Sequence, residues 1–459
     1  MLTFQLSLPA IFAQLSTILM QYIDASMLGR LGANPSASVG LMASATWLLG
    51  GLCIAISAGF TVQVAQKIGA KRFEEARLIM RQAFITCLSV IGVLSIIAMS
   101  ISPILPIWIG GTPEICPDAT AYFFIYTAAL PAAQLYQLSG GMLRCSGNMQ
   151  IPSMASILMC VLDIIFNWLL IFPTHHFSIC GVDFSIWSAD MGVKGAALAT
   201  ALAQVITALY LTIYLLTRSK ELSVFGKRGN KDTLPRGAKR SYLPTIKTLK
   251  MAFMISAPMG LEHIVMCSAQ VLSTVIVAPL GVMSIAANSF AVTAESLCYM
   301  PGYGIADAAT TLIGQSIGAR RLNLTRRFGF ITVGLGMSIM SIMGIVMYFC
   351  APMMMAILTP VQEIIDLGAM ALQIEAWAEP MFAASIVAYG VFVGAGDTLK
   401  PCLMNFISMW GVRLSLAWYL APTWGLKGVW TAMCIELCFR GFIFLLRLRG
   451  HSWMKIRLT

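Results

Sequence analysis

The chain has 459 residues, of which 58% are hydrophobic and only 11% are charged. Soluble domains carry roughly 25% charged residues, so this composition excludes an ordinary soluble enzyme or binding domain and indicates a protein embedded in a lipid bilayer. The net charge of +11 does not indicate a nucleic-acid partner, because the basic residues gather in loops on one side of the predicted membrane spans.

Twelve apolar runs are long enough to form membrane helices, each of which needs about 20 apolar residues to cross the hydrocarbon core. They begin near Phe4, Val39, Gln82, Ala121, Pro152, Gly195, Met251, Ser284, Phe328, Gly368, Pro401 and Gly425. The basic residues follow the even-numbered runs, so the positive-inside rule places those loops and both termini in the cytoplasm. We therefore expect an all-α integral membrane protein with twelve transmembrane helices, located in the plasma (inner) membrane.

The first run, Phe4–Leu28, contains two residues that are unusual in a membrane helix. Pro9 removes a backbone donor and gives the helix a place to bend, so we expect it to act as a hinge. Asp24 is costly in an apolar helix, so we expect it to face protein or a water-filled space and to be functional. The alternative for Asp24 is a residue at the helix end that contacts headgroups or Arg30.

The fifth run carries Asp163 and Asn167, which are four residues apart. This spacing places both side chains on one face of a helix. The face therefore presents one carboxylate and one amide inside the membrane, where polar groups serve either a transport site or hydrogen bonds between helices.

The only long polar stretch, Arg218–Lys250, divides the chain into two similar halves. A shift of 249 positions aligns Gln66–Arg72 with Gln315–Arg321, and Gly141, Gly147 and Pro152 with Gly390, Gly396 and Pro401. One offset that serves separated blocks indicates an internal repeat. We predict two six-helix bundles, residues 1–217 and 251–459, related by a parallel repeat and joined by a cytoplasmic basic linker at residues 218–250. The first half carries about 16 extra residues near Thr174–Asp190, where the offset falls to 233.

The second half has its own acidic residues, since the position equivalent to Asp24 is Ser273. Glu375 and Glu379 share a helix face, and two carboxylates this close are expected to hold at least one proton between them near neutral pH. Glu436 precedes Arg440 by four residues and is expected to form a structural ion pair. Arg413, in the eleventh run, is expected to neutralise a neighbouring acid.

Three blocks of the sequence together resemble the multidrug and toxic compound extrusion (MATE) family. They are Tyr22–Gly32, Glu295–Gln315 and Gly394–Pro401, which are similar to the end of the family's first helix, its eighth helix and its tenth-to-eleventh loop. The resemblance covers the whole chain, including the repeat. It implies efflux of small organic cations by alternating access, coupled to entry of H⁺ or Na⁺, by a protein that we expect to act as a monomer.

The resemblance also assigns roles to particular residues. The segment Gly195–Thr200 is similar to a family motif whose threonine belongs to the ion site, so Asp24, Asp163, Asn167 and Thr200 form the candidate ion-coupling site. Many prokaryotic members have the Asp163 and Asn167 pair in reversed order, which moves the charge by one turn. The expected residues of the substrate cavity are Glu262, Glu295, Glu375 and Glu379. Family members often have a glutamate at the position of Met266, whereas here Glu262 lies one turn earlier.

An ion gradient is the expected energy source, because the chain has no phosphate-binding loop and no His-Glu-x-x-His metal motif. We therefore expect no cofactor, no resident metal and no enzymatic activity. One alternative is a lipid-linked saccharide flippase of the same superfamily, which usually needs several buried basic residues, whereas Arg413 is nearly alone. The others are an intramembrane enzyme, with His263 beside Glu262 as the only candidate pair, and a channel. Cys116 and Cys180 are both expected on the external side, where an oxidising compartment would allow a disulfide between them.

Overall fold

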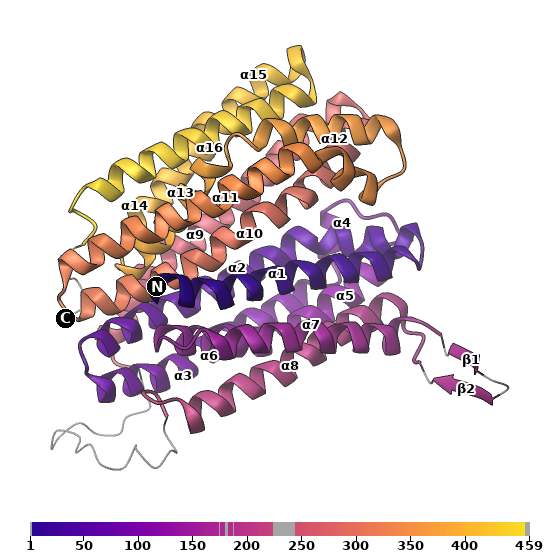
Figure 1. Ribbon diagram of the computed structural model, residues 1–459. Helices are drawn as coiled ribbons and strands as arrows, with labels where there is room; N and C mark the ends of the chain where they lie inside the picture. The colour runs from indigo at the N-terminus through magenta and orange to yellow at the C-terminus, as the bar shows by residue number, and fades with distance from the viewer. Residues whose placement is uncertain (1, 174, 180–181, 187, 224–243, 455–459) are drawn as a thin grey trace.

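The computed structural model describes residues 2–173, 175–179, 182–186, 188–223 and 244–454. The helices of the first half are α1 (Leu2–Gly29), α2 (Ala33–Gly69), α3 (Phe73–Ile101), α4 (Leu105–Trp108), α5 (Cys116–Ala128), α6 (Leu130–Cys145), α7 (Gln150–Ile171) and α8 (Gly192–Arg218). Between α7 and α8 lie the strands β1 (His175–Ile179) and β2 (Val182–Ile186). Figure 1 shows the helices of this half lying side by side along one direction.

The second half begins with α9 (Ile246–Val277), the 3₁₀ turn η1 (Ala278–Leu280), α10 (Val282–Gly318) and α11 (Leu322–Leu358). It continues with α12 (Gln362–Glu375), α13 (Glu379–Gly394), α14 (Leu399–Phe406), the π-helical segment η2 (Ile407–Leu414), α15 (Ser415–Trp424) and α16 (Leu426–Arg449). Each predicted apolar run falls on one helix or on consecutive helical segments. In Figure 1 the indigo-to-magenta helices of the first half and the pink-to-yellow helices of the second lie on opposite sides of the molecule.

Two of the predicted spans are broken at equivalent prolines. α6 begins at Leu130–Pro131 directly after α5, and α13 begins at Glu379–Pro380 shortly after α12. Proline cannot donate to the preceding turn, so the helix ends there and restarts with proline in its first turn. Among the described residues, eight helices are long and apolar enough to cross a membrane, or nine if α12 and α13, bent by 62°, form one span. The count of twelve spans therefore stays a prediction.

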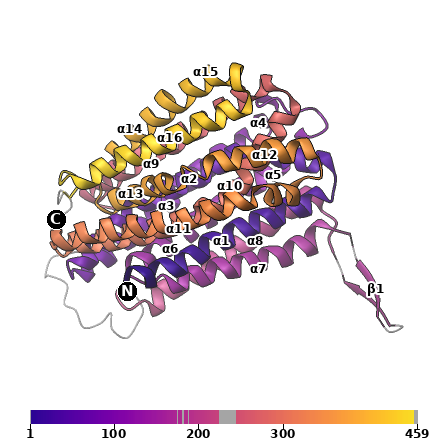
Figure 2. The ribbon, with the colours of Figure 1, turned by 45° about the horizontal axis from the view of Figure 1, so that its top comes forward.

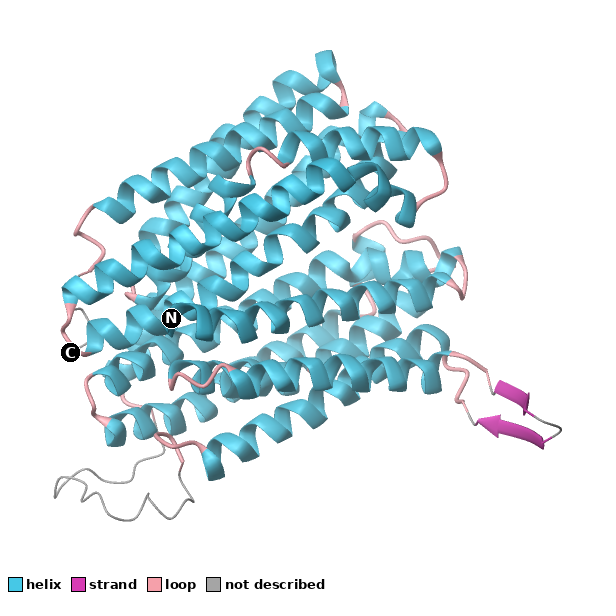
Figure 3. Ribbon diagram, in the orientation of Figure 1, coloured by secondary structure: helices cyan, strands magenta, loops and turns pink. Residues whose placement is uncertain are grey.

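The extra residues in the first half form a β-hairpin. β1 and β2 pair antiparallel, with His175 opposite Ile186 and Ile179 opposite Val182. Figures 1 and 2 show this hairpin projecting away from the ends of α7 and α8. Figure 3 shows helices throughout the rest of the described chain, so the predicted all-α class holds for the fold, while ten residues here pair as two short strands.

The backbone repeats its turns at the offset found in the sequence. Left-handed φ angles occur at Gly32 and Gly281 (123° and 98°), at Lys71 and Arg320 (60° and 58°), at Gly147 and Gly396 (86° and 77°), and at Gly192 and Gly425 (55° and 59°). The first three pairs are 249 positions apart and the last 233. Non-glycine residues rarely adopt such angles, so their recurrence at Lys71 and Arg320 shows that α2 and α10 end in the same tight turn.

The two halves meet through equivalent helices. α1 packs against α10, α9 packs against α2, and α2 also contacts α10. Since α9 is the repeat of α1 and α10 the repeat of α2, the first two contacts are the same contact made in both directions. Buried apolar side chains fill the space on either side, such as Met80 and Leu143 in the first half and Met340 and Trp430 in the second.

Candidate functional site

Asp24, Asp163 and Asn167 come together between α1 and α7. Nδ2 of Asn167 donates a hydrogen bond to Oδ1 of Asp24 at 2.6 Å and another to Oδ2 of Asp163 at 2.8 Å. The side chains of Asp163 and Asn167 are 0% exposed. One amide thus joins two carboxylates that lie 139 positions apart in the sequence.

This cluster has more acceptor atoms than donors. Oδ1 of Asp163 and Oδ1 of Asn167 are buried and accept no hydrogen bond within the described part of the chain. A buried oxygen without a donor is unfavourable, and two adjacent carboxylates repel each other. A proton shared by the carboxyl groups, or a small hard cation held by their oxygens, relieves both costs.

Thr200 and Tyr122 border the same cluster. The Thr200 hydroxyl donates to the carbonyl oxygen of Ala196 at 3.2 Å and lies within interaction range of the Asp163 carboxyl group. Tyr122 of α5 lies within electrostatic range of both carboxyl groups. The four residues predicted for ion coupling therefore lie in one region. Tyr122 was missed because its spacing along the chain carries no signal of which helix α5 would face.

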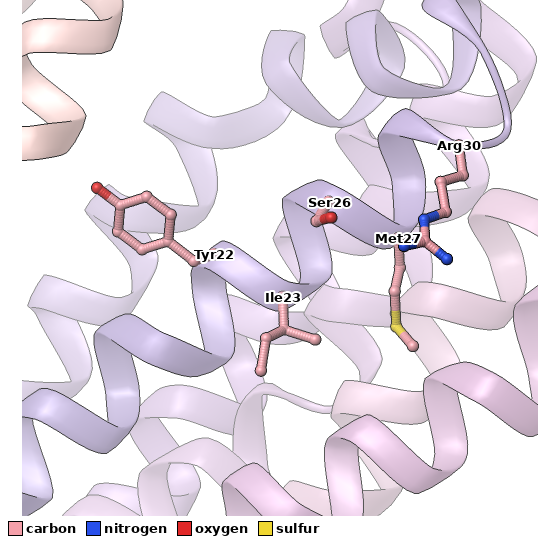
Figure 4. A pocket seen from close by; sticks show the side chains of 5 residues that line it. All are labelled: Tyr22, Ile23, Ser26, Met27 and Arg30. Atoms are coloured by element: carbon pink, nitrogen blue, oxygen red, sulfur yellow. The ribbon is translucent and has the colours of Figure 1, made fainter. Parts of the chain in front are cut away.

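A shallow pocket of 260 Å³ lies on α1 near this cluster, lined by Tyr22, Ile23, Ser26, Met27 and Arg30. In Figure 4, Tyr22 and Arg30 mark its two ends. The Tyr22 hydroxyl donates to the carbonyl oxygen of Thr293 in α10 at 2.7 Å. Asp24 does not line the pocket, and among the described residues Arg30 forms no ion pair with it. The Asp24 side chain is instead engaged by Asn167.

In the second half, three glutamates from different elements gather in the interior. Glu295, Glu375 and Glu379 are 6%, 0% and 0% exposed. The Glu375 carboxyl lies against that of Glu295, and Glu379 is within electrostatic range of both. No donor among the described residues reaches the carboxyl oxygens of Glu375 or Glu379. The interaction between Glu375 and Glu295 is a hydrogen bond only when one of the two carboxyl groups carries a proton.

Two arginines of this half, the buried Arg440 and the half-buried Arg413, make different contacts. Arg440 forms the predicted ion pair with Glu436, with Nε and Nη2 each 2.8 Å from a carboxylate oxygen. Ser408 also donates to Glu436. Arg413 forms no ion pair among the described residues, and its Nη2 lies 2.7 Å from Sδ of Met433. The prediction that Arg413 neutralises an acid is thus wrong for a direct contact, and Arg413 acts on the acids only at longer range.

Glu262 is set apart from the other three glutamates. It accepts a hydrogen bond from the Asn405 amide of α14 and interacts with Tyr389 of α13. The neighbouring His263 points to α2, where the centroid of its ring lies 5.8 Å from that of Trp47 and the ring lies against Gly51. Glu262 and His263 therefore face different helices and do not form the acid–base pair that an intramembrane enzyme would need.

A sequence model of the MatE family matches residues 9–169 and 258–419. This chain belongs to the MATE family. It is 26% identical over 460 residues to the probable multidrug resistance protein NorM of Thermotoga maritima, an alignment that covers 98% of this chain and 92% of that protein. It is 25% identical over 465 residues to the probable NorM of Idiomarina loihiensis, with 97% and 92% covered.

Solved structures have the same fold. The Vibrio cholerae MATE transporter VcmN in its bent form matches with a TM-score of 0.84 and 17% identity over 99% of this chain and 96% of that one. A MOP superfamily transporter from Pyrococcus furiosus matches with a TM-score of 0.87 and 20% identity over 98% and 94%. The MATE resemblance is confirmed. This MATE-family chain is therefore a multi-pass membrane transporter and not an enzyme, and transporters of the family need no cofactor.

One sequence hypothesis falls outside this MATE structure. Cys116, at the start of α5, forms no disulfide with another described residue, whereas Cys180 lies outside the described residues. Their pairing therefore stays a hypothesis.

Proposed function

We propose that this chain exports small organic cations in exchange for H⁺ or Na⁺ by alternating access between two six-helix bundles. The bundles are residues 1–217 and 251–459, and residues 218–250 link them on the cytoplasmic side of the plasma (inner) membrane, where both termini also lie. Support comes from the repeated backbone turns, from the match to the MatE family and from relatives named as probable multidrug resistance proteins. In this proposal the transporter works as a monomer.

The observation that carries the proposal is the pair of carboxylates joined by Asn167. Asp24 comes from α1 and Asp163 from α7, so the charge of the cluster affects how these two helices pack. Binding of one cation neutralises one charge and removes the demand of Asp24 for water. Thr200 and Asn167 supply neutral oxygens that suit Na⁺, while the two carboxylates suit a shared proton, so this set of groups accepts either ion.

The second-half glutamates supply the negative charge that an organic cation requires. Among the described residues, Glu295, Glu375 and Glu379 are buried and form no ion pair with a base, and the Arg440 charge is neutralised by Glu436. Glu262 adds a fourth carboxylate near Asn405. A flippase for lipid-linked saccharides would instead need unpaired basic groups to hold a pyrophosphate, which makes this alternative the weaker one.

Pro9 links the neutralisation of Asp24 to a change in access to the space between the bundles. It lies inside α1, which continues as a helix from Leu2 to Gly29, and it removes one backbone hydrogen bond from that helix. When Asp24 is neutralised at the other end of α1, the helix is free to bend near Pro9 and to change access to the space between the bundles.

The decisive test uses purified protein in sealed vesicles that contain ethidium as a fluorescent organic cation. Transport is measured with a pH gradient alone, a Na⁺ gradient alone, and neither. We expect export under one gradient and only passive leak without a gradient. Equal ethidium movement in all three conditions would reject gradient-driven exchange, while a response to one ion identifies the coupling ion.

A further inference from the structure

Near their last residues, α2 and α10 each form a hydrogen bond to the opposite half through a glutamine side chain. Nε2 of Gln315 donates to the carbonyl oxygen of Cys145 at 2.7 Å, and Nε2 of Gln66 lies 3.5 Å from that of Gly394. The repeat offset converts Gln66 into Gln315 and Cys145 into Gly394. The two bonds are therefore one interaction that is made once in each direction.

The acceptors explain why these bonds form. Cys145 is the last residue of α6 and Gly394 the last residue of α13. The final carbonyl groups of a helix have no partner within that helix and must find one elsewhere. Each glutamine thus caps a helix of the other half. Gln66 is 6% exposed and Cys145 4% exposed, so the bond of Gln66 is sheltered from competing water and that of Gln315 is partly sheltered.

Glycines allow the backbones to approach at the same place. A Cβ atom on Gly69 would clash with the carbonyl oxygen of Gln315, and a Cβ atom on Gly318 would clash with that of Gln66. The repeat relates these two contacts as well. A contact in which residue i meets the copy of residue j, and j meets the copy of i, is produced by a two-fold axis. The axis therefore passes between α2 and α10 at this level.

The glutamine pair lies at the end of the molecule where the linker leaves and returns. Leu222, near the start of the linker, and Ala252, just after its end, pack in the same buried cluster as Ile68 of α2. In the topology of the proposed function, this end is cytoplasmic.

We propose that Gln66 and Gln315 form a two-fold latch that holds the two bundles together on the cytoplasmic side, and that both bonds break when the transporter opens toward the cytoplasm. This inference rests on the proposed alternating access. Each bond joins a helix of one bundle to a helix of the other, so separation of the bundles at this end breaks both. The glycines at 69 and 318 set how closely the latch shuts.

The experiment measures a distance and not transport. Spin labels are attached through an unnatural amino acid at positions 71 and 320, so that the native cysteines stay unlabelled; Lys71 and Arg320 are exposed just beyond the ends of α2 and α10. Pulsed dipolar spectroscopy in lipid nanodiscs then gives the populations of short and long distances. We expect the ratio of long to short distances to rise roughly fivefold for each bond removed by Gln66→Leu or Gln315→Leu, and the double variant to exceed both.

Gln362→Leu is the matched control, because Gln362 is an exposed glutamine whose amide donates to Asp366 on its own helix and not to the other half. It should leave the distances unchanged. If the leucine pair does not fold, Gln66→Asn with Gln315→Asn keeps the amides but shortens their reach by one methylene group, and the same rise is expected. A folded double variant with the wild-type distance distribution overturns the latch. If the wild-type protein moves no ethidium but the leucine variants still show the rise, the latch is retained and the proposed function is rejected.

Discussion

Gly304 of α10 lies directly against the backbone of Ile11 in α1. A Cβ atom at residue 304 would be 2.7 Å from the Ile11 nitrogen, a distance that real side chains do not tolerate. This crossing lies two residues from Pro9, the proposed hinge. α1 is thus pressed against the second half at the point where its own hydrogen bonding is weakest.

Gly304→Ala should therefore force α1 away from α10. Overpacking of this kind costs about 1–3 kcal/mol, and we expect both a lower unfolding temperature in detergent and slower ethidium export. Gly334→Ala is the control, since Gly334 lies inside α11 with no atom within 4 Å of an added Cβ. It should be neutral or stabilising, because alanine favours a helix by up to about 1 kcal/mol over glycine. Equal effects of both variants would contradict a special role for the crossing.

Pro9→Ala should slow export without reducing stability. Alanine restores the backbone donor that proline lacks. In a helix interior this stabilises the helical conformation by up to about 3 kcal/mol, so α1 should bend less readily. The measurement is the rate of ethidium export beside the unfolding temperature. An unchanged rate in a protein that is more stable would show that α1 does not bend at this position during transport.

Asp24→Asn should insert and fold but lose gradient-driven export. The substitution keeps the shape and the contact with Asn167 but removes the charge on which a membrane potential acts with about 2.3 kcal/mol per charge per 100 mV. Asp118→Asn, in the first turn of α5, is the control and should transport normally. If Asp24→Asn exports at the wild-type rate with the same ion dependence, the coupling site lies elsewhere, and the second-half glutamates are the next group to examine.

Glu295→Gln and Glu375→Gln should each weaken binding of an organic cation, measured by ethidium fluorescence in detergent. Each substitution removes one carboxylate from the pair that lies in contact. Glu379→Gln should have a similar direction of effect, since Glu379 is buried and its carboxyl oxygens have no hydrogen-bond partner among the described residues. Glu363→Gln is the control, because Glu363 is exposed at the start of the same helix as Glu375. If all three buried substitutions leave ethidium binding unchanged, these glutamates have a structural role only.

The ion pair between Glu436 and Arg440 should matter for stability and not for coupling. Removing one partner of a buried pair leaves an uncompensated charge and costs about 3–5 kcal/mol. Arg440→Met should therefore lower the unfolding temperature strongly, whereas Arg440→Met combined with Glu436→Leu should recover much of the loss. The double variant should keep its choice of H⁺ or Na⁺. A change in ion dependence would show that this pair belongs to the transport site.

The sequence predicted the features that depend on local pattern. The 249-position offset, which the backbone repeats at Lys71 and Arg320, and the pairing of Glu436 with Arg440 both depend on spacing along the chain. The gathering of Asp24 with Asp163 and Asn167 was anticipated through the family resemblance.

The features that were missed depend on which helices pack together and how each is rotated. Glu375 lies near Glu295 because α12 packs against α10, and spacing within one run cannot reveal that. Arg413 lies in the π-helical segment η2, where the side chains are rotated relative to an α-helix, and it meets Met433. The hairpin at β1 and β2 was recognised only as extra length.

The matched glutamine bonds also set an energy scale for the transport cycle. A hydrogen bond of this kind contributes about 1 kcal/mol, so Gln66 and Gln315 together hold the closed side by about 2 kcal/mol, a bias of roughly thirtyfold. One elementary charge that crosses a 100 mV potential releases about 2.3 kcal/mol. A single coupling ion per cycle is therefore enough to reverse the bias. Hydrogen bonding much stronger than that of the two glutamine side chains would hold the transporter in one state.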